Sequence, residues 1–216
     1  MLHKYALSIV LKRSFHQFNS IRSFSQKITM ANKTALALLA NGSEEMELVI
    51  TVDVLRRAGV NVTVAGVANA EPTKCSRDVV VVPDKSLQDV AKDVFDVVIL
   101  PGGLGGTDEF IASPLVGEVL KAQQSSDRLI AAICAAPLAL KAHEIGIGKS
   151  ITSYPSVKDK LTADYKYVDD QLVVQDGKLI TSRGPGTAYQ FGLKIAEVLV
   201  GGDKAKQVAS GMLVNC

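Results

Sequence analysis

The chain has 216 residues, of which 47% are hydrophobic and 21% are charged, the composition of one ordinary globular domain. No apolar run approaches the length of about 18 residues that a membrane-spanning helix needs. The three cysteines are far apart, and only three histidines are present. Neither a disulfide framework nor a histidine-built metal site is therefore expected.

Residues 1–30 differ in charge from the rest of the chain. They hold five basic side chains and no acidic one, with apolar residues at helical spacing. This composition is typical of a mitochondrial presequence, and residues 22–25 resemble an arginine-guided cleavage site. The alternative is an unselected extension, with Met30 as a second start. We expect the protein in the mitochondrion and the cytoplasm, with the nucleus as a further candidate. The remainder has a small acidic excess, so neither a nucleic-acid nor a membrane partner is indicated.

The first predicted strand, residues 34–40, leads through a turn into a helix that begins near Glu44. Ser43 is expected to cap this helix. Glu44, Glu45 and Glu47 lie in its first turn, where negative charge complements the helix dipole. Glu47 shares a helical face with apolar residues and is the candidate catalytic acid–base. Because the helix is apolar nearly all round, the pattern leaves its direction open.

Further strands are predicted over residues 60–67, 79–82 and 94–100. Cys75 and Arg77 stand just before the second of these strands. Arg77 is interpreted either as an accessory to an active site or partner, or as an ordinary surface arginine. Cys75 is a second accessory candidate.

A glycine-rich stretch follows the strand that ends at residue 100. Its glycines are not spaced as in the dinucleotide-binding fingerprint, and no ribose-binding acid follows at the required distance. Gly102 and Gly103 would instead bring bare backbone N–H groups close to a reacting atom.

The stretch around Cys134 carries the strongest chemical signal. Residues 129–133 form an apolar run long enough for a buried strand, and residues 135–141 predict a helix with Pro137 in its first turn. A cysteine at this strand-to-helix turn meets backbone N–H groups and the positive end of the helix dipole, which lowers the pKa of a thiol. The same geometry carries the nucleophile in other α/β enzymes. Cys134 is thus a candidate nucleophile, and the alternative is a buried, inert cysteine.

His143 lies nine residues beyond Cys134, half a turn round a helix and roughly 13 Å along its axis. It is therefore expected to be a cap or surface residue rather than the base for Cys134. The chain then predicts a strand over residues 150–153, a hairpin turning at residues 176–177 and a helix over residues 188–200.

Strands that alternate with helices predict an α/β fold, in which a mostly parallel sheet carries helices on both faces. Ligands bind such sheets at the carboxyl ends of the strands, where Cys134, Gly102 and Gly103 are expected.

Several segments in the correct order also resemble a known family. They are residues 42–47, 75–78, 100–103, 131–135 and 181–187. From about residue 33 to residue 214, the chain resembles the parkinsonism-associated deglycases, the DJ-one branch of the DJ/PfpI superfamily. The PfpI branch usually has histidine directly after the cysteine, where this chain has Ala135.

The resemblance implies a flavodoxin-like three-layer sandwich, with residues 31–216 forming a single domain that assembles as a homodimer. It makes Cys134 the reactive thiol and Glu47 its hydrogen-bonding partner. The backbone N–H groups of Gly102, Gly103 and Ala135 would line the oxyanion site.

This chain departs from the family at Tyr154, where the relatives usually carry histidine. Tyrosine can donate a hydrogen bond, but its ordinary pKa near ~10 makes it a poor proton shuttle at neutral pH. The resemblance therefore implies altered activity and a larger role for Glu47.

Two functions are consistent with these residues. The first is a cofactor-free glyoxalase or deglycase that protects against reactive dicarbonyls such as methylglyoxal, or repairs glycated thiols and amines. It would need no metal and no glutathione. The second is a redox sensor or chaperone, in which Cys134 is oxidised to a sulfinate with little turnover. A flavodoxin-like nucleotide binder is disfavoured, because the phosphate-binding fingerprint is absent.

Overall fold

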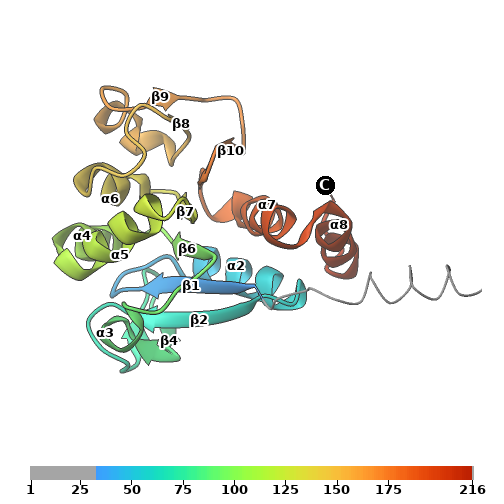
Figure 1. Cartoon of the computed structure of the whole chain (residues 1–216), viewed down its shortest axis with the longest axis horizontal. Helices are drawn as coiled ribbons and strands as arrows, with labels where there is room; N and C mark the ends of the chain where they lie inside the picture. Colours follow the sequence, from blue (N-terminus) through green and yellow to red (C-terminus); the bar gives the residue numbers. More distant parts are fainter. Residues whose placement is uncertain (1–32, 216) are drawn as a thin grey trace, which may run out of the picture. The chain divides into compact units, whose positions relative to one another are not determined.

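The computed structural model describes residues 33–215 of the chain (Figure 1). The strands of its main sheet are β1 (Thr34–Leu39), β2 (Asn61–Gly66), β5 (Lys85–Ser86), β6 (Val97–Leu100), β7 (Leu129–Ile133), β10 (Val173–Asp176) and β11 (Leu179–Ser182). They lie in the order β10-β11-β7-β6-β1-β2-β5. Neighbours run parallel, apart from the antiparallel pair of β10 and β11. The predicted parallel sheet and its hairpin are confirmed.

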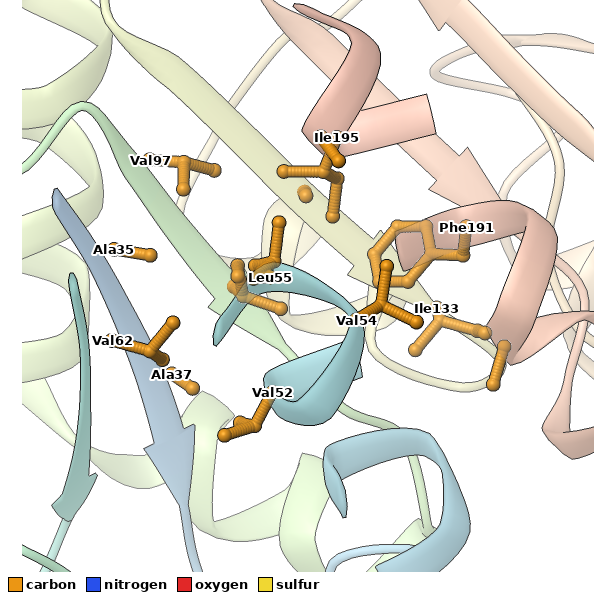
Figure 2. Close-up of a cluster of buried hydrophobic side chains, with 14 of the residues drawn as sticks. Ala35, Ala37, Val52, Val54, Leu55, Val62, Val97, Ile133, Phe191 and Ile195 are labelled. Carbon is orange, nitrogen blue, oxygen red and sulfur yellow. The ribbon is translucent and has the colours of Figure 1, made fainter. Parts of the chain in front are cut away.

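One face of this sheet is covered by α2 (Glu45–Arg57), α7 (Ala188–Val200) and α8 (Gly202–Gly211). Successive side chains of a strand point to opposite faces, so Ala35 and Ala37 of β1 both contribute to this side. Figure 2 shows them in the same cluster as Leu55 of α2 and Phe191 and Ile195 of α7. Burying each large apolar side chain stabilises the fold by about 1.5–3 kcal/mol.

The opposite face carries α3 (Leu87–Val90), α4 (Leu104–Ala112), α5 (Pro114–Ser125) and α6 (Pro137–Ala142). Leu36 and Leu38 of β1 point to this side and share a core with Phe110 of α4 and Leu140 of α6. The sheet is thus buried on both faces, which explains why its strands read as continuous apolar runs. The three-layer α/β sandwich is confirmed.

The arrangement of the strands fixes where a ligand can bind. The order β2-β1-β6-β7-β11 is the 2-1-3-4-5 order of flavodoxin-like sheets. The order reverses between β1 and β6, and open α/β sheets bind ligands outside the carboxyl ends of the strands at such a point. The segments that follow β1, β6 and β7 therefore border the expected ligand site.

Two small ladders lie outside the main sheet. The strands β3 (Thr73–Lys74) and β4 (Val80–Val81) form an antiparallel pair, and β8 (Ser150–Ile151) runs parallel to β9 (Lys166–Tyr167). The strand expected over residues 150–153 is therefore shorter than predicted and belongs to a separate ladder. Two short 3-10 helices follow β8 and β11, respectively: η1 (Pro155–Lys160) and η2 (Pro185–Thr187).

Some predicted helix boundaries were wrong. Glu44, rather than Ser43, caps α2 by accepting a hydrogen bond from the N–H of Glu47, while Ser43 Oγ accepts from the N–H of Ala40. The helix after Cys134 begins at Pro137, two residues later than expected, because residues 134–136 form a turn.

A helix that was not predicted begins in the glycine-rich stretch after β6. Glycine weakens a helix, yet α4 begins at Leu104 and contains Gly105 and Gly106. A Cβ on Gly106 would lie 2.5 Å from Ser43 Oγ, so close packing against the turn after β1 requires a residue without a side chain there.

His143 is the C-cap residue of α6, and its ring Nε2 lies 2.8 Å from the carbonyl oxygen of Phe110. Its predicted role as a cap is confirmed. Within residues 33–215, no helix is both long enough and apolar enough to cross a membrane. The predicted presequence, residues 1–30, lies outside the described residues, as does Cys216.

Candidate active site

Three loops at the carboxyl ends of neighbouring strands meet at one place. Cys134 follows β7 directly, Glu47 lies in the first turn of α2 after β1, and Gly102 and Gly103 follow β6. A pocket of about 520 Å³ opens there, with Cys134, Ala135 and Gly103 among its lining residues. The structure therefore brings together residues that the sequence placed on three separate loops.

Cys134 has a strained backbone. Its φ of 66° lies in the left-handed region, which costs a residue with a side chain roughly 1–2 kcal/mol. Two backbone hydrogen bonds hold it there: its N–H donates to the carbonyl oxygen of Ser182 at 3.0 Å, and the N–H of Tyr154 donates to its carbonyl oxygen at 2.8 Å. The conformation is that of a nucleophile elbow, which turns a side chain out above the end of a sheet.

Glu47 is 1% exposed, and its carboxyl lies close enough to the thiol of Cys134 for the two groups to alter each other's pKa. Its Oε2 accepts a 2.6 Å hydrogen bond from the backbone N–H of Gly102. Its Oε1 is buried and has no hydrogen-bond partner among residues 33–215. Burial raises the pKa of Glu47 to about 7, although the hydrogen bond from Gly102 and the interaction with Cys134 oppose the shift. The carboxyl is therefore able to take up and release a proton near neutral pH.

The thiol of Cys134 does not have the lowered pKa that its position predicts. Burial, followed by the negative charge of Glu47, raises the pKa of Cys134 to about 12. The N–H groups of Gly103 and Ala135 lower the pKa of the thiol, as expected, but their effect is smaller than that of burial and Glu47. The physical reason is that Cys134, a residue only 9% exposed and placed beside a carboxylate, loses more hydration than two backbone donors replace. At neutral pH the thiol therefore keeps its proton, and the carboxyl of Glu47 is the ionisable group beside it.

Gly102 and Gly103 are glycines because no side chain fits at either position. A Cβ on Gly102 would lie 2.5 Å from Cβ of Cys134 and 2.8 Å from Oε2 of Glu47. Gly103 has a φ of 84°, and its Cβ would lie 2.3 Å from the carbonyl oxygen of Gly42. The absence of both side chains lets the backbone approach the sulfur closely.

The mouth of the pocket combines a cationic side chain with exposed aromatic and aliphatic ones. Arg77 lines it and uses Nη1 only to donate to the carbonyl oxygen of Ser76. Tyr154 and Leu104 also line it, and they are 46% and 64% exposed. The structure thus places Arg77 and Tyr154, both candidates from the sequence, at the rim of the pocket.

Cys75, by contrast, does not line the pocket. It is 4% exposed and belongs to the core beneath α2. Burial and the charges of Glu45 and Glu44 raise the pKa of its thiol to about 11. An accessory role for Cys75 in the chemistry therefore has no support in the geometry.

Two residues that contribute to the site, Glu45 and Ser182, were not identified from the sequence. Glu45 accepts hydrogen bonds from Ser76 Oγ and from the N–H of Arg77, both at 2.9 Å, and so fixes the segment that carries Arg77. Ser182 holds the backbone of Cys134, as described above. Glu45 was visible only as one of three glutamates in a first turn, and no local pattern distinguishes it from its neighbours.

Within the described part of the chain, no group of three histidine, cysteine, aspartate or glutamate side chains is arranged to hold a metal ion. The fold and the site together define a class: an α/β protein with a cysteine on a strained turn that faces a buried glutamate. The model of the DJ-1/PfpI family matches residues 33–209, and the chain belongs to this family.

The chain is 60% identical over 183 residues to the protein dj-1beta of Drosophila melanogaster, covering 85% of this chain and 98% of that protein. It is 46% identical to the glutathione-independent glyoxalase DJR-1.2 of Caenorhabditis elegans, covering 82% and 95% of the two chains. The crystal structure of Drosophila melanogaster DJ-1beta superposes with a TM-score of 0.85 at 59% identity, over 86% of this chain and all of that one.

Proposed function

We propose that this protein is a cofactor-free glyoxalase that converts methylglyoxal and related dicarbonyls to hydroxy acids. The observation that carries the proposal is that the buried carboxyl of Glu47, with a pKa of about 7, interacts with the thiol of Cys134, which lines an open pocket. A nucleophile and its base in direct contact are what a covalent mechanism requires.

In the first step, the carboxylate of Glu47 takes the thiol proton as Sγ of Cys134 attacks the aldehyde carbon. The carbon–sulfur bond forms, the carbonyl π bond breaks, and its electron pair moves to oxygen. The N–H groups of Gly103 and Ala135, which already act on the sulfur, are placed to stabilise the resulting oxyanion. Protonation of that oxygen gives the hemithioacetal.

In the second step, Glu47 moves a proton between adjacent carbons. It removes the proton from the carbon bonded to sulfur, giving an enediol, and a proton is returned to the neighbouring carbon. The first carbon is oxidised to a thioester and the second is reduced to an alcohol, so no external oxidant is needed. Water then cleaves the thioester to lactate and regenerates the thiol of Cys134.

The name of the Caenorhabditis elegans relative, a glutathione-independent glyoxalase, supports this reaction. The same attack by Cys134 on a carbonyl adduct would begin the repair of glycated thiols and amines, which we propose as a related activity. A general acid–base at the position of Glu47 can contribute about 10²–10⁴-fold to the rate.

A second candidate function is redox sensing by the same thiol. Cys134 lines the pocket, so peroxide can reach it. One peroxide would oxidise the sulfur to a sulfenic acid, and a second would oxidise it to a sulfinic acid, each releasing water. The unpartnered Oε1 of Glu47, when protonated, would donate a hydrogen bond to a sulfinate oxygen and favour that state.

We further propose that the chain forms a homodimer through α2 and the β3–β4 ladder. This region exposes large apolar side chains that a monomer would leave in water: Met46, Val49, Val79, Val80 and Val82.

We also propose that residues 1–30 deliver the protein to mitochondria, with a fraction in the cytoplasm. A fusion of this segment to a fluorescent protein tests the targeting.

The test of the enzymatic proposal is lactate production from methylglyoxal by the purified full chain. We expect turnover that is lost in Cys134→Ser and kept in Cys75→Ser. No lactate from the wild-type chain, together with a sulfinate on Cys134 after mild peroxide, would favour redox sensing instead.

A further inference from the structure

The segment that holds the strained turn at Cys134 has no regular secondary structure of its own. The strand β8 ends at Ile151, and residues 152–154 follow it outside any helix or strand. From this segment, the N–H of Tyr154 donates the 2.8 Å hydrogen bond to the carbonyl oxygen of Cys134. A strained backbone persists only where the surrounding structure fixes it. The geometry of Cys134 therefore depends on what fixes residues 152–154.

A single side-chain hydroxyl, that of Tyr167 in β9, contacts this segment at three atoms of Ser153. It accepts a 3.2 Å hydrogen bond from the N–H, lies 2.8 Å from Oγ, and lies 3.2 Å from the carbonyl oxygen, to which it is able to donate. A hydroxyl has one proton and two lone pairs, so it can accept from the N–H while it donates to one of the two oxygens. The oxygen Oγ of Ser153 in turn donates to the carbonyl oxygen of Tyr154 at 3.1 Å.

These contacts bear directly on the hydrogen bond to Cys134. The carbonyl oxygen of Ser153 and the N–H of Tyr154 belong to one planar peptide group, so holding one end fixes the direction of the other. Ser153 is 0% exposed, and a buried peptide group that loses its partner destabilises the conformation it is in. The hydroxyl of Tyr167 therefore favours the conformation in which the N–H of Tyr154 points at Cys134.

The position of Tyr167 is itself fixed by the fold. Tyr167 is paired with Ile151 in the small parallel ladder of β8 and β9 (Figure 1), and the next residue, Val168, donates its N–H to the carbonyl oxygen of Ile151 at 2.8 Å. Its ring packs against the core on the side of α4 and α6. The ladder thus carries the hydroxyl to residues 152–154 from a part of the chain that lies more than ten residues away in sequence.

Tyr165, two residues earlier, shows a tyrosine hydroxyl with a different partner. It is 5% exposed, and its hydroxyl donates a 2.7 Å hydrogen bond to the carbonyl oxygen of Ile145. That contact does not involve residues 152–154. Two neighbouring tyrosines therefore differ in one respect that matters here, namely whether the hydroxyl bonds to the segment that holds Cys134.

We propose that Tyr167 is a positioning residue for Cys134. Its hydroxyl holds the peptide group between Ser153 and Tyr154, the N–H of this group holds the carbonyl oxygen of Cys134, and the thiol is thereby kept at the pocket. Tyr167 acts through the backbone and does not line the pocket. The expected effect on turnover rests on the proposed glyoxalase function, whereas the expected effect on the backbone of Cys134 does not.

The experiment compares Tyr167→Phe with Tyr165→Phe in the purified full chain. Phenylalanine keeps the ring, including the face that lies 5.4 Å from Lys158 Nζ, and removes only the hydroxyl. By NMR, we expect Tyr167→Phe to speed hydrogen exchange of the amides of residues 153 and 154 about fivefold, the value of one hydrogen bond. The carbonyl ¹³C signal of Cys134 should shift in the same variant, because the population bonded to the N–H of Tyr154 falls. Tyr165→Phe loses one hydrogen bond elsewhere and should leave these signals unchanged.

Kinetics give a second measurement. We expect kcat for methylglyoxal to fall about fivefold in Tyr167→Phe with KM nearly unchanged, because the loss of one hydrogen bond acts on the placement of the sulfur and not on the pocket wall. Ser153→Ala removes Oγ but keeps the backbone N–H that donates to Tyr167. It should therefore change exchange and kcat in the same direction by a smaller factor.

The outcomes separate this role from a general effect on stability. Unchanged exchange at residue 154 in Tyr167→Phe, or equal changes in Tyr167→Phe and Tyr165→Phe, would overturn the positioning role. Faster exchange at residue 154 with an unmoved Cys134 carbonyl signal would also overturn it, since the turn would then be held without the hydroxyl. Absence of turnover in the wild-type chain, with the expected NMR changes, would support the positioning role and count against the glyoxalase function alone.

Discussion

The carboxyl of Glu47 and the thiol of Cys134 lie beside each other in a site where both have raised pKa values, about 7 and about 12. Burial is the largest cause of both shifts; the charge of Glu47 raises the pKa of Cys134 further, whereas the interaction with Cys134 lowers that of Glu47. At neutral pH the sulfur therefore keeps its proton, while roughly half of the Glu47 carboxyls are ionised and able to accept one. In the proposed mechanism, the cysteine becomes nucleophilic as its proton moves to the glutamate.

Replacing Glu47 by Gln should abolish catalysis while keeping the site intact. The amide oxygen still accepts from the N–H of Gly102, and the amide nitrogen still donates towards sulfur, but the side chain no longer accepts a proton. We expect lactate production to fall by about 10²–10⁴-fold. The same variant should still form a Cys134 sulfinate with graded peroxide, as read by intact mass, whereas Glu47→Ala should lose control of the oxidation state. Full activity in Glu47→Gln would remove Glu47 from the mechanism.

The pH profile of kcat/KM should follow the ionisation of Glu47. Below pH 7 the carboxyl is protonated and cannot act as the base, and above it the carboxylate is present. The rate of dicarbonyl turnover should therefore rise tenfold per pH unit below about 7 and level off above it. A profile that is flat across this range would show that another group accepts the thiol proton.

The same ionisation should make stability depend on pH. The folded-state pKa of Glu47, about 7, lies above its ordinary value of 4.5, so the folded protein holds this proton more tightly than the unfolded chain. The resulting stabilisation is complete below pH 4.5 and is lost as the pH rises to about 7. Glu47→Gln removes this loss and should stabilise the protein above pH 7 by at most about 3 kcal/mol. Urea denaturation of both proteins across this range measures the difference, and equal stabilities at high pH would contradict it.

Gly102→Ala should disrupt the site. The added Cβ would lie 2.5 Å from Cys134 and 2.8 Å from Glu47 Oε2, so one of these two side chains must move. We expect turnover to fall at least a hundredfold, since small misplacements of reacting groups cost this much. Gly211→Ala is the control, because a Cβ there meets nothing within 4 Å. A similar small loss in both variants would mean that the close approach at Gly102 is unimportant.

Tyr154→His should raise dicarbonyl turnover if the rim residue takes part in proton transfer. The backbone N–H at position 154 still holds the carbonyl oxygen of Cys134, so the elbow is kept. An imidazole has an ordinary pKa near ~6.5 and can shuttle protons at neutral pH, which a phenol does poorly. We expect an increase of up to about tenfold in lactate production, with Tyr154→Phe close to the wild type. An unchanged rate in the histidine variant would exclude position 154 as a proton-transfer partner.

Much of the fold could be predicted because local sequence and tertiary packing agree there. The run at β7 is apolar throughout, since a central parallel strand is buried on both faces, and its bounds were predicted correctly. The bounds of α7, Ala188–Val200, were also predicted correctly, and the helix is followed by Gly201, which has a φ of 93°. The helix α4 was missed because its first turn contains Gly105 and Gly106. Glycine has a low helix propensity, but these two glycines allow close packing against the turn after β1.

The sequence by itself determined that Cys134 stands on a strand-to-helix turn and that glycines follow the neighbouring strand, because both depend on residues adjacent in the chain. Only the tertiary structure decided that Glu47 points at the sulfur, that Cys75 is sealed in the core, and that the pKa of Cys134 is raised rather than lowered. These properties depend on desolvation and on charges brought together from separate loops. These groups lose hydration only when the chain has folded, so no local pattern of residues predicts whether a pKa is raised or lowered.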